Sequence, residues 1–131
     1  MTIGYFDANA LVAVLSPGAA GEQGVVLWKA MDAICAHEVV ELEVPSLIGR
    51  QLDRVAWVWT LTSMAITRFD DEIRTRAIDI AWLGAPPLVA VHVATADRVG
   101  VDHYVTADPV ASSRASISGL DVVALDHRNL G

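Results

Sequence analysis

The pattern of apolar and polar residues along the chain changes repeatedly between the period of a strand and that of a helix. Residues 39–44 alternate between apolar and charged side chains, with valine and leucine separated by Glu41 and Glu43. This pattern is typical of a strand with one buried and one solvent-exposed face. Residues 25–37 and 47–65 instead repeat apolar side chains every three to four positions, as an amphipathic helix does. Short apolar runs near both ends of the chain suit buried parallel strands.

Breaking and capping residues set the expected limits of these elements. The glycine-rich segment 17–24 predicts a loop, Asp70 favours a helix start, and Gly100 favours a left-handed helix end. The predicted elements, in chain order, are strand 3–6, helix 8–15, loop 17–24, helix 25–37, strand 39–44, helix 47–65, a helix from Asp70 to Gly84, helix 88–99, strand 103–106, helix 108–117 and strand 121–125. Since strands alternate with helices, we expect an α/β fold in which a parallel sheet of about four or five strands lies between helices.

Composition and charge narrow the class of protein. A length of 131 residues suits a single domain over 1–131, and 53% hydrophobic residues exclude a disordered chain. The net charge of −7 argues against a broad basic face for nucleic acid, but it is compatible with a nuclease whose catalytic groups are carboxylates. Cys35 is the single cysteine, which excludes an internal disulfide and a multi-cysteine zinc site. With no export signal or bilayer-spanning run in view, we expect a cytoplasmic protein without a membrane partner.

Two aspartates follow predicted strands of the sheet. Asp7 comes directly after strand 3–6 and Asp108 comes two residues after strand 103–106. Ligands of open parallel sheets gather at the carboxyl ends of the strands, so the two carboxylates are expected at one edge, each with a small polar neighbour, Asn9 or Thr106. Each aspartate taken alone reads equally well as an N-cap of the following helix. Their pairing favours a functional role.

Three segments carry motifs in a characteristic order. The first is 5–12, Tyr-Phe-Asp-Ala-Asn-Ala-Leu-Val; the second is 44–47, Val-Pro-Ser-Leu, followed by Gln51 and Arg54; the third joins 88–96 to a strand that ends Thr-Ala-Asp. In order and spacing these segments resemble the motifs of PIN-domain ribonucleases, especially the VapC type of bacterial toxin. The resemblance covers nearly the whole chain and implies a PIN-like three-layer fold.

That resemblance implies an acidic cluster that binds Mg²⁺ or Mn²⁺ and hydrolyses RNA. It assigns Asp7 and Asp108 as catalytic metal ligands, Gln51 as a compromised ligand, Asn9 and Thr106 as residues that orient the ligands, and Arg54 as an RNA contact. Two acids usual in the family are replaced here, one by Gln51 and one by Val89, three residues before His92. A unit charge is worth about 4 kcal/mol at 4 Å with an effective dielectric of 20, so metal binding is expected to be weakened.

Two functions from different classes follow. The first is a VapC-like toxin, a divalent-metal-dependent endoribonuclease that forms a homodimer and pairs with a small antitoxin protein. The second is a catalytically inactive PIN-fold protein with a binding or regulatory role. No other acid is expected to replace the missing two, although the sequence leaves open how far the Glu43 side chain reaches. His92 is expected to pack or hydrogen-bond within its own helix.

Overall fold

The computed structural model describes residues 1–125 and centres on a sheet of parallel strands. Every neighbouring pair in the sheet is parallel, and the strand order is β3-β2-β1-β4-β5. The strands are β1 (Ile3–Phe6), β2 (Ala33–His37), β3 (Ala65–Thr67), β4 (His103–Thr106) and β5 (Val122–Ala124). The expected α/β fold with a central parallel sheet is therefore confirmed.

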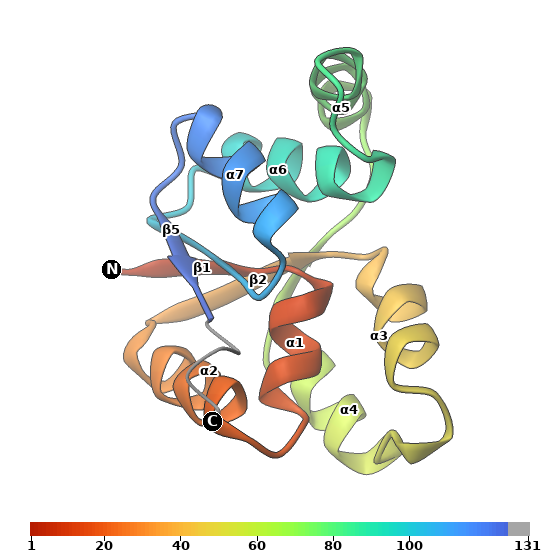
Figure 1. Ribbon diagram of the computed structural model, residues 1–131, viewed down its shortest axis with the longest axis vertical. Helices are drawn as coiled ribbons and strands as arrows, with labels where there is room; N and C mark the ends of the chain where they lie inside the picture. The colour runs from red at the N-terminus through yellow and green to blue at the C-terminus, as the bar shows by residue number, and fades with distance from the viewer. Residues whose placement is uncertain (126–131) are drawn as a thin grey trace.

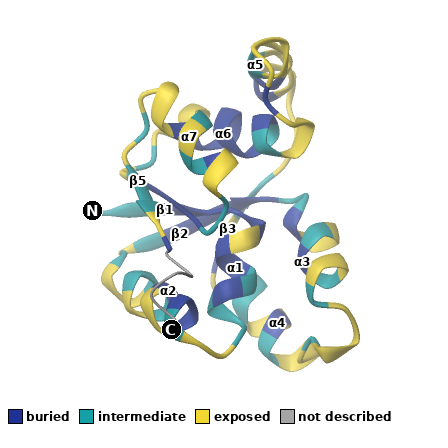
Figure 2. Cartoon of the chain, in the orientation of Figure 1, coloured by how far each residue is buried: buried dark blue, intermediate teal, exposed yellow. Residues whose placement is uncertain are grey.

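Helices cover both faces of this sheet. They are α1 (Ala8–Val14), α2 (Ala19–Ala30), α3 (Val40–Ile48), the 3-10 turn η1 (Gly49–Gln51), α4 (Arg54–Thr62), α5 (Asp71–Trp82), α6 (Pro87–Val99) and α7 (Pro109–Ile117). Figure 1 shows α1 to α4 on one side of the sheet and α5, α6 and α7 on the other. The strands and the inner helix faces are buried, whereas α5 is largely exposed on the outside of α6 (Figure 2).

Strand β1 divides the core between the two faces. Successive side chains of a strand point to opposite sides, so Phe6 packs with the helices of the α1 side and Tyr5 packs with α6 and α7. Both side chains are fully buried. Because β1 is covered on both faces, its sequence is a continuous apolar run rather than an alternating one.

The predicted helix 25–37 is confirmed only for residues 25–30, which belong to α2, and the predicted strand 39–44 is wrong. Residues 33–37 form β2, whose apolar run continues the helical spacing of α2 across the break at Met31, so the pattern alone did not separate them. Residues 40–48 form α3, in which Val40 and Val44 are buried one turn apart and Leu42 is 75% exposed. The alternation of 39–44 therefore does not mark two faces of a strand.

The predicted loop 17–24 and helix 47–65 also need correction. Helix α2 begins at Ala19, and its glycines allow close packing against α1 instead of marking a loop. The long helix is broken at Gly49, whose φ of 73° is a left-handed conformation, and Asp53 then caps α4 by accepting from two backbone N–H groups. The remaining predictions hold: β1, α1, β4, α7 and β5 lie where expected, Asp70 caps α5, and Gly100 ends α6 in the left-handed region.

A bilayer-spanning helix is not found in residues 1–125. None of the single helices there has the length and apolarity that crossing requires. The helices α1 and α2 meet these criteria only when taken together, and they are bent by 103° to each other.

Gly21 tests the packing of α2 on α1. A Cβ atom at this position would lie 2.6 Å from the carbonyl oxygen of Ala13 and would also overlap the carbonyl oxygen of Ser16. Gly21→Ala gains about 1 kcal/mol of helix propensity, but overpacking against rigid backbone outweighs it, and we expect a net loss of roughly 2 kcal/mol in the free energy of unfolding. Urea denaturation measures the change. The exposed neighbour supplies the control, because Glu22→Ala should shift stability by no more than about 0.5 kcal/mol.

Candidate functional site

Asp7 and Asp108 lie at the carboxyl edge of the sheet, after the adjacent strands β1 and β4. The two strands pair in register from Gly4 with His103 to Phe6 with Val105, so the residues that follow them emerge side by side. The backbone N–H of Asp7 continues the ladder by donating to the carbonyl of Val105, 3.3 Å away. The expectation that the strand ends bring these two aspartates to one edge is thus realised in the fold.

The carboxylate of Asp7 is held almost entirely out of water, at 2% exposure. One oxygen, Oδ1, accepts from the backbone N–H of Ala10 at 2.9 Å and so caps α1, while Oδ2 accepts from the hydroxyl of Tyr104 at 3.4 Å. Burial raises the pKa of Asp7, and the charge of His92 and hydrogen bonding by Thr106 offset part of that rise. The edge therefore contains a carboxylate whose charged form is disfavoured unless a cation or donor approaches.

Asp108 occupies the more open side of the pair. Its Oδ1 accepts from the N–H of Val110 at 3.0 Å and caps α7, and its own N–H donates to Oγ1 of Thr106 at 3.0 Å. The negative charge of Asp108 contributes to the raised pKa of Asp7, which means that the two carboxylates act on each other. Both aspartates are N-caps, so the structural interpretation is confirmed at each, and the functional one stays a prediction.

Two stacked tyrosines lie beneath the edge. The rings of Tyr5 and Tyr104 come from the paired strands β1 and β4, with centroids 5.3 Å apart and planes inclined by 13°. Burial, reinforced by the charge of Asp7, raises the pKa of both phenols well above the ordinary value, so both remain protonated donors. Tyr104 donates to Asp7, whereas Tyr5 is hydrogen-bonded to Nδ1 of His92 at 2.6 Å.

His92 connects this edge to Glu43. The expectation that His92 bonds within its own helix is wrong, because its two ring nitrogens contact Tyr5 in β1 and Oε1 of Glu43 in α3, the latter at 2.6 Å. The Glu43 side chain is 15% exposed, and the charge of His92 also acts on Asp7. Glu43 is therefore a third carboxylate near the edge, which sequence reasoning did not place there. A signal was available: with 40–48 read as a helix, Glu43 falls in its first turn, directly after β2.

Gln51, by contrast, does not join this group. It is exposed in η1, beyond the last residue of α3, and five helical residues separate Glu43 from that end, a rise of about 7.5 Å. Since α3 starts at the carboxyl edge and runs away from it (Figure 1), Gln51 lies at the distant end. Arg54 is likewise exposed, as the first residue of α4, and none of the hydrogen bonds or ion pairs described for residues 1–125 joins it to the aspartates.

The other expected residues lie close to the aspartates. Thr106 is fully buried at the end of β4, and Asn9 is exposed in the first turn of α1. Val89 is half-buried on α6 and packs against the cluster that contains both stacked tyrosines. An apolar side chain therefore stands beside the site, at the position where the resemblance implies an acid.

The side chains at the carboxyl edge provide some, but not all, of the ligands that a cation needs. No three His, Cys, Asp or Glu side chains within residues 1–125 lie close enough together to hold a metal ion jointly. Mg²⁺, however, is commonly bound through one or two carboxylates, with water and substrate phosphate completing the shell. Asp7 and Asp108 meet that smaller requirement, and Glu43 adds negative charge nearby without sharing direct ligation with them.

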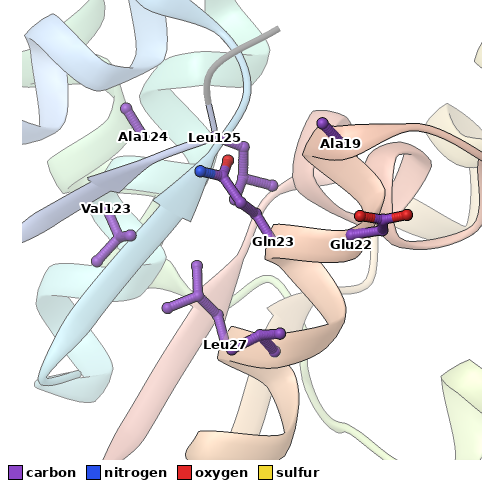
Figure 3. Close-up of a pocket in the computed structure, with 8 residues that line it drawn as sticks. Ala19, Glu22, Gln23, Leu27, Val123, Ala124 and Leu125 are labelled. Atoms are coloured by element: carbon purple, nitrogen blue, oxygen red, sulfur yellow. The ribbon is translucent and has the colours of Figure 1, made fainter. Parts of the chain in front are cut away.

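A cavity elsewhere lacks this chemistry. It has a volume of about 500 Å³ and lies between α2 and β5, where Gln23 points toward Leu125 (Figure 3). Of the side chains that line it, Glu22 alone is titratable, and the rest are mainly apolar. The carboxyl edge is therefore the better candidate for a catalytic or metal-binding site.

Comparison with known proteins identifies a family and a fold. The family model of the PIN domain matches residues 4–116. A toxin–antitoxin complex from Klebsiella pneumoniae is similar in structure, with 18% identity over 94% of this chain and 98% of that chain and a TM-score of 0.76. None of the curated proteins matches the sequence.

Two further solved structures share the fold. VapC20 of Mycobacterium tuberculosis, described as a toxin that cleaves the sarcin-ricin loop, has 15% identity over 84% of this chain and 93% of that chain, with a TM-score of 0.67. DNA-bound VapBC of Salmonella typhimurium has 14% identity over 96% of this chain and 100% of that chain, with a TM-score of 0.70. At such identities the similarity concerns the fold.

The buried Asp7 makes stability depend on pH. Because its folded pKa is raised above 3.8, the folded protein keeps a proton that the unfolded chain releases, and stability falls as pH rises from 3.8 through the raised pKa. Asp7→Asn removes this loss while keeping an N-cap acceptor for Ala10, so the variant should be more stable than the wild type at about pH 7 and equal to it near pH 3.5. Urea denaturation at the two pH values measures this. Asp79→Asn on the exposed face of α5 is the control, and a wild type more stable than Asp7→Asn at neutral pH would contradict the expectation.

Proposed function

Because the chain belongs to the PIN domain family, we propose that it is a VapC-like toxin-type protein that hydrolyses RNA with a divalent ion at the carboxyl edge. The family generally uses divalent metal ions. The observation that carries the proposal is the pairing of Asp7 with Asp108 on adjacent parallel strands, each carboxylate within electrostatic reach of the other. Each of two such carboxylates disfavours the charged form of the other, and a cation bound between them stabilises both charged forms.

Asp7 and Asp108 would hold Mg²⁺ or Mn²⁺. When bound, the ion supplies Lewis-acid polarisation of the phosphate and activation of water at neutral pH. The chain itself orients the carboxylates: Thr106 accepts from the N–H of Asp108, and the N–H of Ala10 and the hydroxyl of Tyr104 donate to Asp7. These contacts restrict both side chains before a ligand arrives, which lowers the entropy lost on binding.

A second candidate function, a catalytically inactive PIN-fold protein with a binding or regulatory role, is favoured by two specific features. Val89 contributes no charge beside the aspartates, and Glu43 is hydrogen-bonded to His92 rather than grouped with them. Such a protein would keep its fold and its partners but would not cleave RNA. The tests below separate the two functions, since cation-dependent cleavage is expected from the first alone.

An antitoxin partner and a homodimer belong to the proposal. The similar solved structures include toxin–antitoxin complexes, which supports a small antitoxin protein as partner. The outer face of α4 presents Val55, Val58 and Trp59, which are 67%, 57% and 70% exposed. An apolar face of this kind on a water-exposed helix supports association with another protein surface, a second copy of the chain included.

RNA cleavage tests the proposed activity. We expect the purified protein to cut single-stranded RNA with millimolar Mg²⁺ or Mn²⁺ and to lose this activity in excess chelator. Asp108→Asn should lower the rate by about 100-fold, the scale on which the loss of one electrostatic group in an active site is felt. The matched control is Asp102→Asn, because Asp102 accepts from the N–H of Ile3 at the opposite edge of the same sheet. Activity that survives Asp7→Asn combined with Asp108→Asn would exclude the assigned site.

A substitution at Val89 tests whether an added negative charge strengthens cation binding at the carboxyl edge. Val89→Asp adds a carboxylate next to the existing pair, and we expect the affinity for Mn²⁺ to rise at least about 10-fold, measured by calorimetry. Val91→Asp is the matched control, since Val91 is also half-buried on α6 but lines the groove between α5 and α6. Gln51→Glu should leave the affinity unchanged. A gain from Gln51→Glu without one from Val89→Asp would contradict this assignment of the edge.

A further inference from the structure

An RNA strand at the carboxyl edge needs positive charge for its phosphates and a surface for its bases. The chain has a net charge of −7, and the carboxylates of Asp7 and Asp108 repel phosphate unless an ion lies between them. Proteins hold single-stranded nucleic acid by combining positive charge along the backbone with aromatic side chains on which bases stack. The segment that leaves β3 at this edge carries both kinds of group, in Arg68, Phe69 and Arg74.

The strand pairing sets this segment near the aspartates. Tyr5 pairs with Cys35 in the parallel ladder of β1 and β2. Two residues further along both strands, the same register sets Asp7 beside His37. His37 in turn pairs with Thr67, the last residue of β3. Because neighbouring strands are about 4.8 Å apart, the end of β3 lies about 10 Å from Asp7. An RNA strand that runs across the edge from β1 therefore reaches the segment after β3.

Phe69 presents a half-exposed aromatic ring at this edge. It is 50% exposed, and its ring lies against the fully buried imidazole of His37, with centroids 4.5 Å apart and planes inclined by 77°. Nδ1 of His37 accepts from the N–H of Val39 at 3.0 Å, so the proton of the neutral ring is on Nε2, which has no hydrogen-bond partner among residues 1–125. An N–H without an acceptor is attracted to an aromatic ring. The contact with His37 therefore holds Phe69 in place and leaves the rest of its ring open to a ligand.

The two arginines beside Phe69 have no acidic partner. None of the hydrogen bonds or ion pairs described for residues 1–125 involves Arg68 or Arg74, whereas Arg76 on the same helix α5 is bonded to Glu72. Arg68 and Arg74 are both exposed, and Arg74 lines with Phe69 a groove of about 380 Å³ between α5 and α6. Unpaired positive charge beside an aromatic ring is complementary to a nucleotide, which joins an anionic phosphate to a flat base.

We propose that this segment is a nucleotide subsite for the RNA, in which a base stacks on Phe69 and the adjoining phosphates bind Arg68 and Arg74. The inference rests on the proposed function, because it states how the RNA cut at Asp7 and Asp108 is held. Stacking and phosphate contacts do not read the hydrogen-bonding groups of a base. The subsite therefore fixes the position of the strand at the edge rather than its sequence.

RNA affinity in the absence of a cation tests the stacking contact while the RNA stays uncut. Fluorescence anisotropy of a labelled single-stranded RNA oligonucleotide, in excess chelator, gives the dissociation constant. Phe69→Ala should weaken binding by about 5-fold to 100-fold, the usual cost of losing one stacked base, whereas Phe69→Tyr should bind as the wild type does. Trp82→Ala is the matched control and should leave the affinity unchanged, because Trp82 is an aromatic residue with 85% exposure at the other end of α5.

The salt dependence of binding tests the two arginines. Each phosphate contact with a single strand releases counterions, so Arg68→Ala and Arg74→Ala should each reduce the slope of log K against log salt concentration by about 0.7. Lys29→Ala is the control with the same change of charge, because Lys29 lies in the last turn of α2, which precedes β2 at the opposite edge of the sheet. Its slope should equal that of the wild type. Far-ultraviolet circular dichroism checks that every variant is folded.

The outcomes separate this subsite from the proposed function. If the wild type cleaves RNA and folded Phe69→Ala binds and cleaves it equally well, the subsite is wrong and the function stands. If the wild type binds RNA through Phe69 and the arginines but does not cleave it with Mg²⁺ or Mn²⁺, the proposed cleavage fails and the subsite stands. An unchanged RNA affinity in Phe69→Ala, together with the loss of a dimer in size-exclusion chromatography, would assign the ring to a contact between copies of the chain and overturn the subsite. A wild type that binds no single-stranded RNA would overturn both.

Discussion

The parallel pairing of β1 with β4 is the constraint on which the rest of this structure depends. It places the ends of two strands that are about a hundred residues apart in sequence at one edge, in register from Gly4 to Phe6. Asp7 and Asp108 then follow the ends of neighbouring strands, and the charge of Asp108 acts on Asp7. A shift of one residue in this register would also exchange the faces of Tyr5 and Phe6, so core packing and the site are fixed by the same pairing.

The two aspartates have a structural task besides the role proposed for them. Each aspartate caps a helix through one oxygen, which stabilises the fold locally. The other oxygen of Asp7 accepts from the hydroxyl of the buried Tyr104. Burial of Asp7 costs stability when it is charged, and such a cost is typical of a site arranged for a ligand rather than for folding alone.

The residues around the two aspartates differ from one side of the edge to the other. Val89 makes one side apolar, while Glu43 is hydrogen-bonded to His92, which is bonded in turn to Tyr5. The two stacked tyrosines deliver separate contacts, Tyr104 to Asp7 directly and Tyr5 to Glu43 through the imidazole. Side chains buried beneath the edge thus contact both Asp7 and, through His92, Glu43.

The sequence by itself determined the elements whose signals are local. The strands at both ends, the capping aspartates, Gly100 and the alternation of strands with helices were all predicted, because each depends on a few neighbouring residues. Segments 25–37 and 39–44 were misread because a strand buried on both faces lacks alternation, and a short helix such as α3 can imitate it. The placement of Gln51 came from the family resemblance instead, and the sequence left the reach of Glu43 open. Only the tertiary structure decided which carboxylates meet, since the contact of Glu43 with His92 joins residues 49 positions apart and follows from how α3 and α6 pack around β1, which no local pattern encodes.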